Sequence, residues 1–149
     1  MARLSVVIAA LWWGSLTTLG FMVVPMLFAN LPTPAMAGGI AAKLFSVQTW
    51  LSCVCGLLLL MISSKKRPEV PVPVEYFAIS CIAGGMLLSL LAEFAIAPRI
   101  MVGDSLKLWH SVGSAMYVLH WVCAGATLWK VAVPRVVSQC SEVKVQSTS

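Results

Sequence analysis

The chain has few charged side chains. Only 10% of its 149 residues are charged and only 5 are acidic, whereas soluble domains carry about 25% charged residues. Hydrophobic residues make up 60% of the chain, more than the roughly 45–50% found in soluble domains. So few charges could not cover a water-soluble fold of this length, and many apolar side chains must therefore face lipid. The composition indicates an integral membrane protein.

Cysteine and histidine occur in patterns that do not suggest a metal site. The 5 cysteines include no C-x-x-C motif and their number is odd, which argues against both a disulfide framework and a zinc site. His110 and His120 lie on one expected helix, about 15 Å apart at ~1.5 Å per residue, so they cannot both ligate one haem iron. We expect no bound metal and no resident cofactor. A haem with His and Met ligands, or copper(I) held by His110 and methionines, remains an alternative.

Four apolar segments are long enough to cross the roughly 20 residues of a bilayer core. They are residues 4–28, 44–62, 76–97 and 108–129. The segment 76–97 contains Glu93, and the other three contain no charge. Backbone groups in lipid need internal partners, which favours helices. The sequence therefore predicts an all-α, polytopic bundle of four transmembrane helices in residues 1–134, followed by a disordered cytoplasmic tail in residues 135–149.

The positive charges indicate how the bundle is oriented. Seven of the 10 Lys and Arg residues fall on one expected side, and Lys43, Arg99 and Lys107 fall on the other. By the positive-inside rule, both termini and the loop containing Lys65 lie in the cytoplasm.

Threonine and proline mark the ends of several expected helices. Thr33 followed by Pro34 is typical of a helix start, although Gly38 and Gly39 would weaken the helix that follows. Pro134 predicts the end of the fourth helix.

The two hairpins resemble each other in sequence: the first and third spans end in Phe21 to Pro25 and Phe94 to Pro98, and the next spans begin with Lys-Leu-aromatic. This pattern suggests a parallel internal repeat.

Glu93 is the main candidate functional residue. An ionisable residue inside a span is a functional-site candidate by default and needs a partner. The antiparallel hairpin brings His110 to a similar depth, Lys43 enters the second span at the same side, and Arg99 lies at the mouth. The outward-facing group Glu93, His110, Lys43 and Arg99 is either a structural ion pair that locks two helices or a site linked to a proton or cation.

A second polar stripe runs along the fourth span. His110, Tyr117 and His120 follow helical spacing and fall on one face. Because polar groups in lipid need partners, we expect Tyr117 and His120 to bond to the hydroxyl of Thr17, Thr18, Ser52 or Ser89, with a backbone carbonyl as the alternative partner for His120. A structural role is favoured for His120.

Several short segments carry a resemblance to a known family. They are residues 12–21 (WWGSLTTLGF), 24–28 (VPMLF), 41–45 (AAKLF), 93–99 (EFAIAPR) and 108–110 (LWH). The chain resembles the bacterial transmembrane-protein-205-like family, an uncharacterised domain family numbered 4149, over roughly residues 4–130. The resemblance implies a four-helix inner-membrane protein and no established activity. A remoter likeness is to copper-resistance-D-like membrane proteins, some of which handle copper or haem.

These patterns indicate a broad class of function, but they identify no chemical reaction. We expect a multi-pass protein of the bacterial inner membrane that is not an enzyme. It would be an accessory or small-solute and ion-handling bundle with a polar site around Glu93 and His110. The alternatives are a membrane redox or metal-binding protein and a structural partner of another membrane protein. Expected partners are the lipid bilayer and either a second copy of the chain or another membrane protein, but no nucleic acid.

Overall fold

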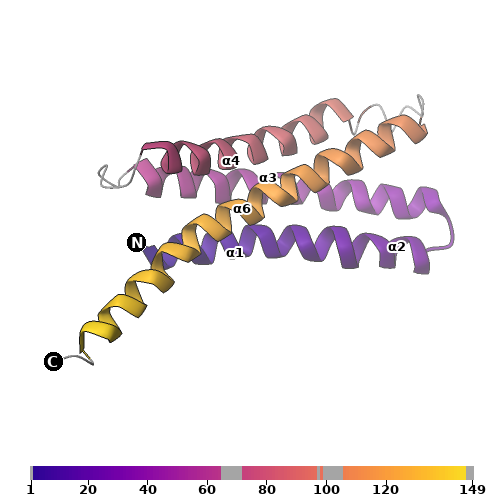
Figure 1. Cartoon of the computed structure of the whole chain (residues 1–149). Coiled ribbons are helices and arrows are strands. Elements are labelled where there is room, and N and C mark those ends of the chain that lie inside the picture. Colours follow the sequence, from indigo (N-terminus) through magenta and orange to yellow (C-terminus); the bar gives the residue numbers. More distant parts are fainter. Residues whose placement is uncertain (1, 65–71, 97, 99–105, 147–149) are drawn as a thin grey trace.

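The computed structural model describes the backbone of residues 2–64, 72–96, 98 and 106–146 and the side chains of residues 3–63, 76–95, 98 and 108–133. Apart from residues 31–33, the described backbone is helical and contains no strand. The elements are α1 (Ala2–Thr18), η1 (Leu19–Val23), α2 (Val24–Asn30), α3 (Pro34–Ser64), α4 (Val72–Leu91), η2 (Ala92–Ile96) and α6 (Leu106–Gln146). The predicted all-α class is therefore confirmed (Figure 1).

Four helices are long and apolar enough to cross a membrane, as the sequence predicted. They are Arg3–Asn30, Pro34–Ser63, Tyr76–Ala95 and Leu108–Val133. Large apolar side chains such as Val47, Trp50 and Leu87 point away from the protein on these helices, each more than half exposed. An exposed apolar surface of this kind suits lipid and would be unstable in water.

The turn between the first two spans follows the predicted capping pattern. The Met36 backbone N–H donates to the Thr33 hydroxyl at 3.3 Å, and Pro34 is the first residue of α3. A proline is tolerated there because the first backbone N–H groups of a helix have no intrahelical partner. The helix then continues through Gly38 and Gly39. The weakening that we expected at these glycines does not interrupt the helix.

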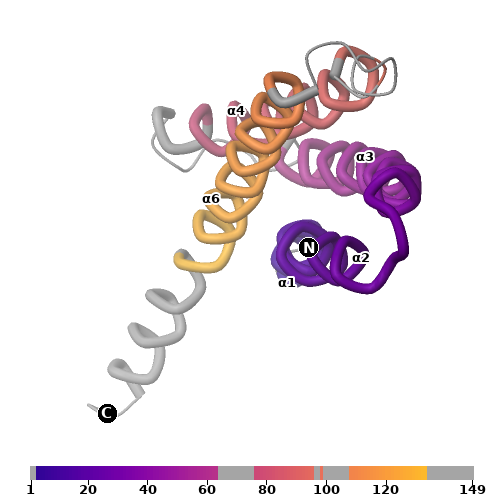
Figure 2. The backbone as a smooth tube through the Cα atoms, turned by 90° about the vertical axis from the view of Figure 1, so that its right-hand side faces the viewer, coloured from indigo at the N-terminus to yellow at the C-terminus, as the bar shows by residue number. Residues whose placement is uncertain are grey.

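The helices pack in a ring in which each long helix has two neighbours. Helix α1 contacts α3 and α6, and α4 contacts the other sides of the same two helices. Seen nearly along α1, α3 and α6 lie on its two sides (Figure 2). Figure 1 shows α6 crossing the other helices obliquely.

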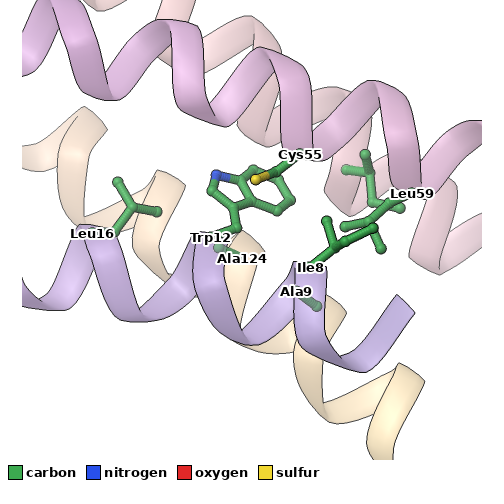
Figure 3. Packing of buried hydrophobic residues seen from close by; sticks show 8 residues of the cluster. Ile8, Ala9, Trp12, Leu16, Cys55, Leu59 and Ala124 are labelled. Carbon is green, nitrogen blue, oxygen red and sulfur yellow. The ribbon is translucent and has the colours of Figure 1, made fainter. Parts of the chain in front are cut away.

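Trp12 lies at the centre of the buried core. Its side chain is fully buried and extends from α1 toward α3, with Cys55 beside the indole and Ile8 packed near Leu59 one or two turns away (Figure 3). Ile82 from α4 and Ala124 from α6 complete the cluster, so all four long helices contribute to one core.

Two π-helical segments interrupt the spans at matching positions. Phe21 and Phe94 are each the third residue of their segment, η1 and η2, and Pro25 and Pro98 each follow two residues after its end. In η1 the Val24 N–H bonds to the Leu19 carbonyl, five residues back. A proline lacks an N–H and crowds the preceding turn of an α-helix, and a wider turn relieves that crowding. The two hairpins that resemble each other in sequence therefore also share a π-helical segment before the proline.

Helix α6 is longer than the sequence predicted. Its backbone remains helical through Pro134 to Gln146, where we had expected a helix end and a disordered tail. Proline removes one N–H and displaces one carbonyl, a local defect that can be tolerated where water can satisfy the freed carbonyl. The remaining tail residues 147–149 lie outside the described residues.

Candidate functional site

Helix α3 carries several polar side chains of the interior. Ser46 and Thr49 face α4 and η2, and Gln48 and Ser52 lie on the side that faces α1. Spacings of three and four residues place each pair on one helix face. Helix α3 therefore presents one polar face to each of its two neighbours.

Glu93 lies in η2 and is half-buried. Its Oε1 accepts a hydrogen bond from the Ser46 hydroxyl at 2.6 Å. This length is short for a hydrogen bond between two oxygen atoms. One turn further into the span, the Thr49 hydroxyl donates weakly to the Ser89 carbonyl at 3.5 Å. The Glu93 carboxylate therefore joins the third span to the second, through a neutral partner.

Lys43 and His110 were predicted as cationic partners of Glu93, whereas its observed partner is the Ser46 hydroxyl. Lys43 and His110 are exposed, and no ion pair joins either of them to Glu93 within the described side chains. His110 is still near in depth: the contact between Gly85 and His120 sets an antiparallel register that brings Glu93 close to the level of Val112. Arg99 lies outside the described residues.

Tyr117 has a different hydrogen-bond partner from the one we expected. Its hydroxyl donates to the Leu16 backbone carbonyl at 2.6 Å, and its ring meets Phe45 edge to face at 5.4 Å. The expected hydroxyl of Thr17 instead accepts the indole N–H of Trp121 at 2.8 Å. The prediction of a hydroxyl partner for Tyr117 is corrected, since a helix carbonyl keeps a second lone pair that can accept a bond.

His120 is buried with only 4% of its surface exposed, facing the Trp12 ring at 5.7 Å between centroids. Its Nε2 has no hydrogen-bond partner in the part of the chain that the structure describes. The hydroxyl partner expected for His120 is therefore not found at this nitrogen.

Sequence reasoning overlooked Gln48. The side chain is 7% exposed, and its amide donates to Ser15 at 3.0 Å and to Ser52 at 3.4 Å. An amide inside an otherwise apolar run is itself a signal, because burying it without partners costs about 2–7 kcal/mol. The same argument that selected Glu93 applies, with less force, to Gln48.

The described residues do not assemble an obvious metal centre. No group of three His, Cys, Asp or Glu side chains comes together among them. His110 is exposed on α6, and the described methionines Met22 and Met26 are about 60% exposed near the end of the first span. The copper or haem alternative, which uses methionine ligands, stays a prediction.

The fold and the interior polar contacts define the class of protein: an all-helical protein with four helices long and apolar enough to cross a membrane. The chain belongs to the family described as a domain of unknown function, DUF4149, whose model matches residues 7–102. The match covers the first three membrane-length helices and ends before α6 begins at Leu106. No curated protein and no solved structure matches the chain.

Proposed function

We propose that the protein is a multi-pass protein of the bacterial inner membrane that exchanges a proton or a small cation at Glu93. Both termini face the cytoplasm in this proposal, and the site faces outward. The supporting observation is that the Glu93 carboxylate, inside a membrane-length helix, bonds to the neutral Ser46 hydroxyl and forms no ion pair among the described side chains. The protein acts as a small-solute or ion-handling bundle and not as an enzyme.

The charge of Glu93 favours exchange over a structural lock. A carboxylate that locks two helices in lipid gains most when a fixed cation offsets its charge. A hydroxyl supplies one hydrogen bond but no positive charge. The negative charge is then balanced by what the site takes up, which is a proton or a cation of the size that one carboxylate and one hydroxyl can contact.

The position of Glu93 also suits exchange with the outer solution. Glu93 lies in a π-helical segment, and such segments are frequent at functional sites. Exposed Lys43 lies one turn from Ser46 on α3, and His110 is exposed on α6. In the proposed topology these residues, with Arg99, surround the mouth and set its charge.

No observation favours the alternatives of a copper or haem centre or of a purely structural partner. The likeness to transmembrane-protein-205-like proteins belongs to this proposal, since it also implies a four-helix inner-membrane protein.

Carbodiimide labelling tests the exchange site without knowledge of the cargo. Dicyclohexylcarbodiimide enters membranes and modifies carboxyl groups that are protonated in apolar surroundings, and peptide mass spectrometry locates the adduct. We expect Glu93 to be labelled faster than Glu75 and Asp104, which flank the predicted spans and serve as controls in the same molecule. A bound cation such as sodium or potassium should protect Glu93 from labelling.

Two variants separate exchange from structure. Ser46→Ala removes the hydroxyl that donates to the Glu93 carboxylate and should speed labelling about tenfold or more, since a hydrogen bond to a charged group contributes about 1.5–3 kcal/mol and about 1.4 kcal/mol is a factor of ten. Glu93→Gln keeps an acceptor for Ser46 and should leave the melting temperature in detergent unchanged. The proposal fails if Glu93 is labelled no faster than Glu75 and Asp104, or if Glu93→Gln strongly lowers the melting temperature.

A further inference from the structure

Two buried ring nitrogens in the centre of the protein lack hydrogen-bond partners. They are Nε1 of Trp12 on α1 and Nε2 of His120 on α6, and no described atom bonds to either. Trp12 is fully buried and His120 is 4% exposed. The two rings face each other, with centroids 5.7 Å apart and planes tilted by 57°.

These two atoms are exceptions within the interior. Every other buried polar side chain that the structure describes takes part in a hydrogen bond or another polar or ring contact: Ser5, Gln48, Thr49, Ser52, Ser89 and Thr127. An unsatisfied buried donor or acceptor costs about 1–3 kcal/mol, and lipid offers no partner that would reduce this cost. Two such atoms on facing rings therefore point to one shared partner.

The surroundings of the pair limit what this partner can be. On the α4 side, a Cβ added at Gly85 would lie 3.1 Å from the Trp12 ring and 3.3 Å from His120 Cδ2, so the α4 backbone closes that side. Toward α3, Cys55 lies beside the indole (Figure 3). The hydrogen-bonded group of Gln48, Ser15 and Ser52 lies about one turn away, because Ser15 follows Trp12 by three residues. The partner must be small, uncharged and polar.

We infer that one water molecule binds between Trp12 Nε1 and His120 Nε2. The indole N–H can only donate, so the partner must accept a bond from it. A neutral imidazole Nε2 either donates or accepts, depending on its tautomer, and water satisfies both cases. A water needs only about 10–15 Å³ and two to four polar partners, and the two rings supply two of them.

This site goes beyond the proposed exchange at Glu93. It adds one bound water about one turn from the Gln48 group, and it gives His120 a ligand-binding role. It does not involve Glu93, so either proposal can fail while the other stands.

Nuclear magnetic resonance of the full chain in detergent micelles tests the site directly. With ¹⁵N-labelled tryptophan, the chain gives one indole N–H signal for each of its 6 tryptophans, and Trp12→Phe identifies the signal of Trp12. We expect a nuclear Overhauser contact between the Trp12 indole proton and water. His120→Leu should abolish this contact and shift the Trp12 signal, whereas His120→Gln, which keeps hydrogen-bonding capacity, should retain it.

His110→Leu is the matched control, because His110 lies on the same helix but is exposed and has no contact with Trp12. It should leave the Trp12 signal unchanged. Two results would overturn the inference: a Trp12 indole proton without a water contact in the wild-type chain, or a scalar coupling from Trp12 Nε1 to His120 Nε2, which would show a direct bond between the rings. Because both are measured on the wild-type chain, the test stands even if His120→Leu does not fold.

Discussion

Replacing Gly20 with alanine should disturb the contact between the first and fourth spans. Gly20 lies in η1, and a Cβ placed there would collide with Cε1 of Tyr117 and lie 2.9 Å from its hydroxyl oxygen. The Tyr117 ring has little freedom to move away, because its hydroxyl donates to the Leu16 carbonyl and the ring packs edge to face with Phe45. An added methyl group must therefore displace the ring.

The magnitude follows from these contacts. Overpacking a close contact costs about 1–3 kcal/mol. Losing the Tyr117 hydrogen bond adds about 0.5–1.5 kcal/mol. The helical preference of alanine over glycine returns up to about 1 kcal/mol. The free energy of unfolding of Gly20→Ala should thus fall by roughly 0.5–4.5 kcal/mol, or about 2–14 °C in melting temperature at ~3 °C per kcal/mol.

Gly14→Ala is the control, since no atom lies within 4 Å of a Cβ at Gly14 on the same span. Thermal unfolding of both variants is measured in the same detergent. Gly14→Ala reports the helical preference of alanine alone, and Gly20→Ala reports this preference together with the collision. Gly14→Ala should be as stable as the wild type or slightly more stable. In a Tyr117→Ala background, Gly20→Ala should cost little, because the colliding ring is gone. Equal stability of the two glycine variants, or an undiminished cost in that background, would refute the reasoning.

Three further outcomes are expected. Thr17→Val removes the acceptor of the Trp121 indole and should lower the free energy of unfolding by about 1–2 kcal/mol, measured by denaturation in detergent; an unchanged stability would show that this bond contributes nothing. Thr33→Ala removes the side-chain acceptor of the Met36 N–H and should cost about 0.5–2 kcal/mol, whereas Thr33→Ser should cost little and a loss equal to that of alanine would contradict a capping role. Alkaline phosphatase fused after Ser138 should be inactive if the C-terminus is cytoplasmic, and an active fusion would reverse the proposed topology.

The spans could be read from the sequence because lipid imposes a simple rule. A membrane-length helix must be long, apolar and nearly free of charge, and these properties belong to each segment independently of its neighbours. The cap at Thr33 was predictable for a similar reason, since it depends on residues only three apart. Pro134 misled the prediction because the cost of a proline depends on whether its displaced carbonyl can find another partner.

Partners across the interior could not be read in the same way. Ser46 meets Glu93 because two helices separated by a loop take up one antiparallel register, which depends on the packing of all four helices. Tyr117 finds a backbone carbonyl, and any helix offers many of these without a distinctive sequence. The sequence therefore identified Glu93 and His120 as residues of interest, but not what each would contact.

The two π-helical segments change how the residues that follow them in the first and third spans must be numbered on a helical wheel. Such a segment accommodates one residue more than an α-helical turn, and one residue corresponds to about 100° of rotation. Residues beyond η1, including Pro25, are therefore out of phase with a wheel drawn through α1. Accessibility measured by scanning cysteine along residues 4–30 should show one periodicity up to Thr18 and the same periodicity, displaced in phase, from Val24 onward.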